Sequence, residues 1–327
     1  MPPSMNSLSH ASLEQAAQWY VQLHDQDVGE PERLRWQAWL AQSGEHQEAW
    51  RYVERVGQRF ATLHSDHHPQ AASHALRSTA RTPISRRQGL KGLLVVGAAS
   101  LLGWGTWRGT ALPDSLARWS ADLSTGTGET RETLLSDGSR IWLNALSALD
   151  VRFDGAQRLL QLRAGEVLID TAKDSLRPFL VDTAQGRLRA LGTRFSVRQE
   201  SARTLLNVYG GAVEVRTPQG QVQVVDSGRQ LVVDDKGFAS LTPANPGREA
   251  WRRGVLLADN LPLGQLVEEL SHYRAGHLAC DPAIAGLPVM GSFPLHDTDQ
   301  ALRLLEAALP VQVHQRLPWW VSIGPRG

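Results

Sequence analysis

The chain has 327 residues, with 34 basic and 33 acidic side chains and a formal net charge of +1 at pH 7. This balance excludes a strongly basic nucleic-acid-binding protein and a protein with a long acidic tail. Hydrophobic residues make up 42% and charged residues 20%, as in folded domains, and the length predicts two or three of them. Cys280 is the only cysteine, so no disulfide can form within the chain.

Residues 1–63 have the pattern of three amphipathic helices. Ser12 and Gln15 form a capping-box pattern that opens the first helix, and Pro31 suits the first turn of the second. A Ser-Gly pair at 43–44 separates the second helix from the third. We therefore expect a small all-α module, which at about sixty residues is marginal for independent stability.

Four of the eleven tryptophans fall in this module, which is too small to bury all four rings. Ordinary core packing explains some of them, whereas an exposed aromatic patch would bind a protein partner. The candidate partner-binding residues are Trp19, Trp36, Trp39, Leu40 and Trp50. Residues 1–60 contain five arginines and eight acidic residues, so they offer no basic recognition face, and direct binding to nucleic acid is disfavoured.

Residues 64–88 lose the helical period and are rich in Ser, Thr, Ala, His and Arg, which predicts a flexible linker. Its histidines lack a scaffold of carboxylate ligands, so we interpret them as solvated and expect no metal site. Arg86 and Arg87, within Ser-Arg-Arg-x-Gly-Leu-Lys, resemble a twin-arginine export signal. Adjacent arginines before a membrane helix are also common as plain topology anchors.

An uncharged run at 92–107 lies within residues 89–112, where we expect a single transmembrane helix. A soluble core helix is the alternative, but Trp104 and Trp107 at one end of the run suit a membrane interface. Basic residues precede the run, which predicts a cytoplasmic N-terminus and a periplasmic C-terminus. The predicted location is the inner membrane, crossed once.

Residues 118–242 change to alternating short strands separated by turn pairs, of which Asp137-Gly138 is the strongest hairpin signal. The pattern predicts an all-β domain and leaves a sandwich, a jelly-roll and a short β-solenoid open. The region contains no histidine, so a serine–histidine nucleophile cannot be assembled within it. We expect neither an enzyme active site nor a cofactor.

Residues 250–327 read as β-α-β-β-α-β-β, which predicts a small α+β layer fold. This part looks like the short signalling domains at the amino ends of secretins and TonB-dependent transducers, and Gly291-x-Phe293 is similar to their pattern.

Short motifs of the all-β region stand in one order along the chain: Gly128-Glu129-x-Arg131, Leu135-x-Asp137-Gly138-Ser139, Leu143-Asn144-Ala145, Arg158-x-Leu160-x-Leu162, Gly165-Glu166, Arg177-Pro178-Phe179-x-Val181, Leu191-Gly192-Thr193-x-Phe195-x-Val197-Arg198 and Gly210-x-Ala212-Val213. Together they resemble the FecR family of transmembrane sigma-factor regulators. The resemblance implies that the helical module binds an extracytoplasmic-function sigma factor. It also implies a signal from the signalling domain of an outer-membrane, TonB-dependent siderophore transducer, and release by periplasmic and intramembrane proteases.

In some relatives the Gly-Thr bond resembles a self-cleavage point, which here is Gly192-Thr193. The Thr193 hydroxyl would attack the Gly192 carbonyl and convert the amide to an ester; a plain turn between two strands is the other interpretation. Two rival classes remain for the whole chain. One is a membrane-anchored receptor or scaffold whose β domain binds a ligand, with a structural helical module. The other is a membrane-tethered DNA-binding regulator, which the charge of the module disfavours.

Overall fold

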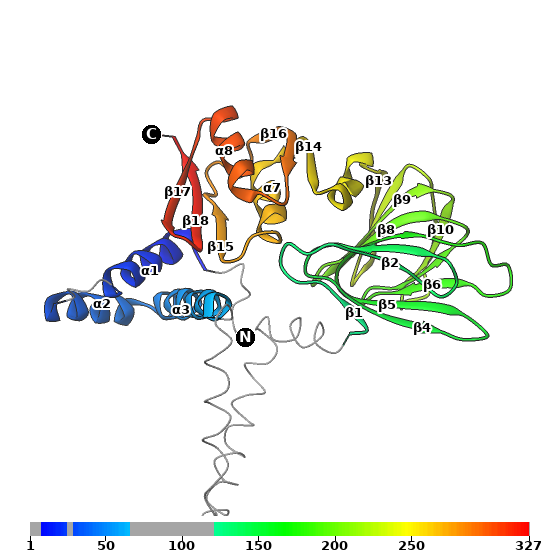
Figure 1. Cartoon of the computed structure of the whole chain (residues 1–327), viewed down its shortest axis with the longest axis horizontal. Helices are drawn as coiled ribbons and strands as arrows, with labels where there is room; N and C mark the ends of the chain where they lie inside the picture. Colours follow the sequence, from blue (N-terminus) through cyan, green and yellow to red (C-terminus); the bar gives the residue numbers. More distant parts are fainter. Residues whose placement is uncertain (1–7, 25–28, 66–120, 327) are drawn as a thin grey trace, which may run out of the picture. The chain divides into compact units, whose positions relative to one another are not determined.

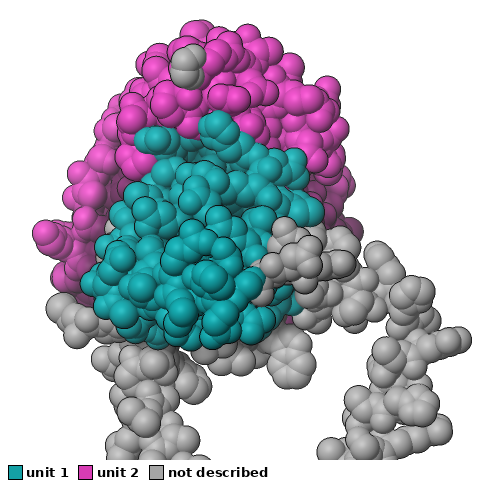
Figure 2. Space-filling model, turned by 90° about the vertical axis from the view of Figure 1, so that its left-hand side faces the viewer, with its two compact units in different colours: residues 1–113, 276–281, 314–323 teal, residues 114–275, 282–313, 324–327 magenta. Residues whose placement is uncertain are grey.

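The computed structural model describes residues 8–24, 29–65 and 121–326 (Figure 1). The chain divides into two compact units, which have different colours in Figure 2. Unit 1 contains residues 1–113, 276–281 and 314–323, and unit 2 contains residues 114–275, 282–313 and 324–327. Each unit is built around an apolar core of its own.

Unit 1 begins with three helices, α1 (His10–Leu23), α2 (Glu30–Gln42) and α3 (Gly44–Ser65). The cap of α1 is Ser9, whose hydroxyl oxygen accepts a hydrogen bond from the Ser12 amide at 3.2 Å. The expected capping box at Ser12 is therefore wrong, because Ser12 is buried inside the helix that Ser9 opens. Ser43 ends α2, and its hydroxyl accepts a hydrogen bond from the His46 amide at the start of α3.

The other part of unit 1 comes from the end of the chain. Strands β15 (His277–Cys280), β18 (Trp320–Pro325) and β17 (Val311–Leu317) form a three-stranded sheet in that order, and β15 runs parallel to β18. Trp319 and Trp320 join the buried residues of the helices in one cluster with Ala16, Ala17, Trp39, Ala49, Trp50 and Val53. Rings and alanines therefore make up most of this core.

Most of unit 2 is a system of thirteen strands in two connected sheets. The first sheet contains β1 (Leu123–Ser124), β4 (Ala148–Phe153), β5 (Arg158–Asp170), β6 (Phe179–Asp182), β7 (Arg187–Ala190), β10 (Ala212–Arg216) and β11 (Val222–Asp226). The second contains β2 (Arg131–Leu134), β3 (Arg140–Leu143), the end of β5, β8 (Arg194–Gln199), β9 (Arg203–Gly210), β12 (Arg229–Asp234) and β13 (Gly237–Pro243). Among these described strands, every pair is antiparallel except β5 with β6.

Strand β5 connects the two sheets, since its first half pairs with β4 and β6 and its second half with β3 and β8. Gly165 lies at the change of sheet with φ +79°, and a Cβ there would lie 2.5 Å from the Ser147 Cα, so only glycine fits. The sequence pattern reads Ala164-Gly165 as a turn between two strands, whereas the chain continues through it as one strand of 13 residues. Both sheets contribute to a single apolar core, dominated by Leu, Val and Ile.

A second set of elements in unit 2 follows the sheets. The 3-10 helix η2 (Pro246–Arg253) leads to β14 (Val255–Pro262), which pairs antiparallel with β16 (Pro288–Pro294). Helices α7 (Leu263–Ser271) and α8 (Thr298–Ala308) bury Leu263, Leu266, Leu270, Leu302 and Leu305. The order β14-α7-β15-β16-α8-β17-β18 is the order that the sequence pattern predicts.

The predicted membrane helix requires a correction. In the parts of the chain that the structure describes, no helix combines the length and the apolar character needed to cross a membrane. The longest described helix, α3 with 22 residues, carries charged residues along its length. This finding overturns the single transmembrane helix in the predicted fold class and the single-pass inner-membrane location. The expected span at 89–112, Arg86 and Arg87, and nearly all of the linker at 64–88 lie outside the described residues.

Candidate functional site

The first candidate site is the cluster of rings on the helical module. The rings of Trp36 and Trp50 meet edge to face with centroids 5.0 Å apart, and those of Trp19 and Trp39 lie 6.5 Å apart at 43°. His46 stacks on Trp39 at 4.5 Å. Such pairs contribute about 0.5–1.5 kcal/mol each beyond the burial of their area. The structure therefore brings the four predicted tryptophans of three helices into one cluster.

The predicted partner-binding residues differ in exposure. Trp39 and Trp50 are buried, at 7% and 8% exposure, and the indole N–H of Trp39 donates to the side chain of Gln15 at 2.9 Å. Trp19, Trp36 and Leu40 are half-buried and pack against the outside of the same core. The first pair builds the module, and the other three are the ones that a partner can reach.

Sequence reasoning missed the rings that the end of the chain adds to unit 1. Tyr20 meets Trp319 edge to face at 5.3 Å, and His277 stacks on Trp320 at 3.9 Å. Glu14 binds Arg316 at 2.8 Å and the Ser322 hydroxyl at 2.7 Å. Because these partners are about 300 positions apart in the chain, no local pattern could indicate them.

The second candidate site is a buried cluster of ions in unit 2. Glu269 of α7 accepts hydrogen bonds from Arg198 of β8 at 2.5 Å and from Arg248 of η2 at 2.8 Å. Arg248 also binds Glu166 of β5 at 3.2 Å, and Arg198 also binds Glu200 at 3.1 Å. The cluster connects the β sheets with η2 and α7, so it fixes these elements against each other.

Asn144 and Tyr273 extend this cluster. The amide nitrogen of Asn144 donates to Glu166 at 3.2 Å, and the Tyr273 hydroxyl donates a short hydrogen bond to the Asn144 oxygen. Burial raises the pKa of Tyr273, so its hydroxyl stays protonated and acts as a donor. Burial also raises the pKa of Glu269, but Arg248 and Arg198 outweigh it and lower that pKa to about 2.

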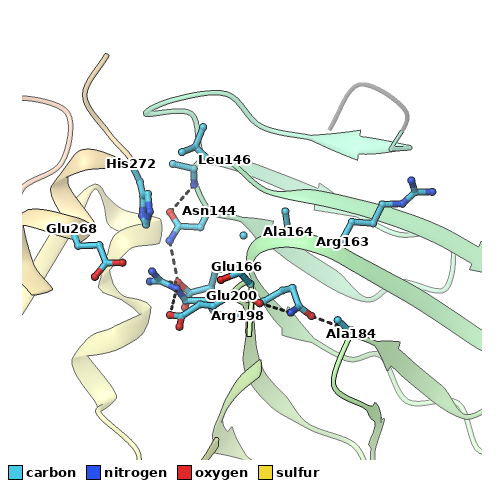
Figure 3. Close-up of a pocket in the computed structure, with 14 residues that line it drawn as sticks. Asn144, Leu146, Arg163, Ala164, Glu166, Ala184, Arg198, Glu200, Glu268 and His272 are labelled. Atoms are coloured by element: carbon cyan, nitrogen blue, oxygen red, sulfur yellow. Dashed lines mark hydrogen bonds and ion pairs between the residues drawn. The ribbon is translucent and has the colours of Figure 1, made fainter. Parts of the chain in front are cut away.

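A cavity of about 580 Å³ lies beside the ion cluster. Figure 3 shows Asn144, Glu166 and Arg198 at its wall, with Glu268 of α7 and His272 at the end of that helix facing them. Burial lowers the pKa of His272, so this ring is neutral at pH 7. Arg163, a further lining residue, is bound to Asp150. The arginines of the cavity are therefore already neutralised by carboxylates of the chain itself. Among the described residues, no group of three or more His, Cys, Asp or Glu is placed to hold a metal ion.

The third candidate site is the predicted cleavage bond, which lies in the loop between β7 and β8. Gly192 is exposed and has φ +80°, and Thr193 is 3% exposed. The Thr193 hydroxyl donates to the Ala212 carbonyl at 2.7 Å and accepts from the Leu191 amide at 3.1 Å. The Thr193 side chain is therefore held by the backbone of Leu191 and Ala212 instead of pointing into solvent.

The sequence pattern also contains a buried arginine whose role only the structure shows. Arg158 is 4% exposed, binds Asp137 at 2.9 Å, and donates to the carbonyls of Ala172 and Arg177 at 3.1 Å and 2.9 Å. It therefore holds the turn of the β2–β3 hairpin and the loop before β6 together. Arg158, Glu166 and Arg198 all fall in the motifs that carry the family resemblance, so charged residues within strand motifs were the available signal.

The fold and these sites define a modular protein, in which a ring-rich helical module is combined with a two-sheet β domain and a following α+β segment. The sequence profile of the FecR protein family matches residues 121–214, and that of a domain of unknown function, DUF4880, matches residues 14–56. The match to the FecR profile confirms the resemblance found in the motifs of the β domain.

Solved structures show the same fold. A 1.65 Å crystal structure of a Parabacteroides distasonis ATCC 8503 protein, provisionally assigned as an anti-sigma factor, is 21% identical with a TM-score of 0.55. It covers 62% of this chain and 98% of its own. A 2.50 Å structure of a protein with the same assignment and organism is 22% identical, with a TM-score of 0.54 and coverage of 62% and 96%. No curated protein matched the chain.

Proposed function

We propose that this chain regulates an extracytoplasmic-function sigma factor, which it binds through the helical module. The observation that carries the proposal is the graded ring cluster, in which Trp39 and Trp50 are core and Trp19, Trp36 and Leu40 are half-buried around it. Half-buried aromatic side chains over a fixed core are typical of the energetic centre of a protein interface. The FecR family and the provisional assignment of the structural neighbours as anti-sigma factors support the same function.

The full chain and the purified sigma factors of its source cell provide the test. Trp36→Ala and Trp19→Ala should each weaken binding at least about tenfold, as loss of an interface anchor does. Leu34→Ala is the matched control, because Leu34 lies on the same helix as Trp36 but is 58% exposed and outside the cluster. Failure of the parent chain to bind any sigma factor would reject the proposal, and so would tryptophan variants that bind as tightly as Leu34→Ala.

The finer part of the proposal concerns the signal. A siderophore transducer of the TonB-dependent type would contact this chain through its signalling domain, and regulated proteolysis would end the interaction with the sigma factor. The family resemblance supports both steps, and the β-α-β-β-α-β-β order from β14 to β18 supports the first. Binding of the purified signalling domain to the full chain, and its loss on deletion of residues 250–327, would test it.

Binding of a small polar ligand in the cavity of Figure 3 has less support. Arg198 and Arg163 at its wall are paired with carboxylates of the chain. An anionic ligand would have to displace these carboxylates from the arginines. Direct DNA binding has no support from the module either, because acidic residues outnumber basic ones there.

Self-cleavage at Gly192-Thr193 is the second activity that we propose. Its support is the fixed position of the Thr193 hydroxyl, which accepts from the Leu191 amide and donates to the Ala212 carbonyl. Purified parent protein should give two fragments on a denaturing gel, whereas Thr193→Ala should give one intact band. A single full-length band for the parent would reject the activity and leave the sigma-factor proposal unaffected.

A further inference from the structure

One side chain contacts the nitrogen atom that would leave if the Gly192-Thr193 bond broke. The hydroxyl of Thr171, the residue that follows β5, accepts a hydrogen bond from the Thr193 amide at 2.9 Å and donates to the Thr193 carbonyl at 3.1 Å. The Thr171 amide donates to the same carbonyl at 3.1 Å. One hydrogen bond at the amide nitrogen and two at the carbonyl oxygen therefore fix the backbone of Thr193 against Thr171.

The attacking group is held from the opposite strand pair. Ala212, the first residue of β10, accepts the Thr193 hydroxyl proton at 2.7 Å, and its carbonyl also accepts from the Leu191 amide at 3.0 Å. A Cβ at Gly211 would lie 2.4 Å from the Gly192 carbonyl oxygen, so glycine allows these two loops to approach. Thr171 and Ala212 thus constrain the two reacting groups of Thr193, its nitrogen and its hydroxyl.

We propose that Thr171 is a catalytic residue of the self-cleavage, and this inference rests on the proposed activity at Gly192-Thr193. The Thr193 oxygen attacks the Gly192 carbonyl carbon, and its proton passes to a water molecule. As the carbon–nitrogen bond breaks, the nitrogen becomes pyramidal and gains a lone pair. The Thr171 hydroxyl then turns from the Thr193 carbonyl, gives its proton to this nitrogen and regains one from water. The product is an ester between Gly192 and the Thr193 side chain, with no net gain or loss of protons.

Water can approach Thr171 and the Gly192 residue whose carbonyl is attacked. Thr171 and Gly192 both line a cavity of about 340 Å³ beside the loop, and Gly192 itself is exposed. Water from this cavity can hydrolyse the ester, which leaves a carboxylate on Gly192 and a free amine and hydroxyl on Thr193. The site thus holds a nucleophile, a hydroxyl within hydrogen-bond distance of the leaving nitrogen, and access for water.

The test compares freshly synthesised full-length chains with and without the Thr171 hydroxyl. Thr171→Val keeps the shape of the side chain but removes the proton donor, so cleavage should slow about 10²-fold, as general acid catalysis predicts. Thr171→Ser should restore cleavage. Thr183→Val is the matched control, because the Thr183 hydroxyl also bonds a turn carbonyl, that of Gly186, in the neighbouring β6–β7 hairpin.

Hydroxylamine separates a chemical role from a structural one. It attacks an ester far faster than an amide, so it should convert the parent to a Gly192 hydroxamate and give about 10²-fold less with Thr171→Val. Cooperative unfolding in urea should show that both chains are folded under the conditions of the assay. Cleavage of Thr171→Val within about twofold of the parent, with Thr193→Ala uncut, would reject the role of Thr171 and keep the self-cleavage. An uncut parent would reject both. Equal slowing in Thr171→Ser and Thr171→Val would also reject the role of the hydroxyl.

Discussion

The helical module and the β domain bury apolar surface in different ways. The module combines large rings with alanines, so Ala16, Ala17 and Ala49 allow its helices to approach while Trp39 and Trp50 fill the space beside them. The β domain has a continuous core of branched aliphatic side chains from both sheets, with Phe179 and Phe195 as its buried rings. In the module the same ring cluster supplies both buried and half-buried side chains, whereas the β domain buries its aliphatic core almost completely.

The largest expected effect tests whether the cores of the two units are independent. Phe195 of β8 is fully buried, so Phe195→Ala should cost about 3–5 kcal/mol in the unfolding of the β domain, measured with urea. Sigma-factor binding should not change, because the ring cluster lies in the other unit. Leu134→Ala, at a residue that is 66% exposed, should change stability by less than about 0.5 kcal/mol. Loss of binding in Phe195→Ala would show that the two cores are not independent.

The second expected effect is a loss of stability of unit 2 at acidic pH. Arg248 and Arg198 hold the pKa of Glu269 at about 2 despite its burial, against about 4.5 in the unfolded chain. A lowered pKa means that the stabilisation is present above pH 4.5 and is lost as the pH falls toward 2. Unit 2 should lose up to a few kcal/mol in this range. Glu269→Gln should flatten the dependence of unfolding free energy on pH between 4.5 and 2; an unchanged slope would contradict the ion cluster.

Unit 1 should respond at a higher pH. Burial against Trp320 and Tyr52 lowers the pKa of His277 to about 4, and the ring is held neutral. His10 lowers this pKa further, while Glu14 opposes the shift. Because the unfolded chain binds the proton at about pH 6.5, stability of unit 1 falls as the pH drops from 6.5 to 4. Aromatic near-ultraviolet signals should report this loss, and His277→Gln should remove most of it.

The parts of the fold that sequence predicts are those with a local cause. Asp137-Gly138 marks the β2–β3 hairpin because a tight turn needs the left-handed conformation that Gly138 adopts at φ +83°. Ala164-Gly165 carries the same signal but marks the passage of β5 between sheets, which depends on the contact with Ser147 from another strand. An X-Gly pair therefore predicts a positive φ at the glycine. Whether the chain turns there depends on the residues from other strands that pack against that glycine.

The candidate sites divide in the same way. The sequence indicated the ring cluster and the Gly192-Thr193 bond from residue types alone. It did not indicate Thr171 at that bond, nor the pairing of Arg248 with Glu166 across 82 positions, because hydrogen-bond partners distant in sequence leave no periodic signal. The uncharged run at 92–107 led to a prediction that was wrong. Its hydropathy predicted a membrane helix, but no described helix is long and apolar enough to cross a membrane.

The smallest expected effect separates backbone angle from close contact within the β domain. Gly211 and Gly220 have φ of +76° and +85°, but a Cβ at Gly211 would lie 2.4 Å from the Gly192 oxygen, whereas Gly220 has no atom within 4 Å. Gly220→Ala should therefore cost only the left-handed strain of about 1–2 kcal/mol. Gly211→Ala carries the same strain and must also displace the loop of Gly192, so its urea midpoint should fall further. Equal midpoints for the two variants would mean that the loops of Gly192 and Gly211 separate at little cost and that their close contact does not stabilise the β domain.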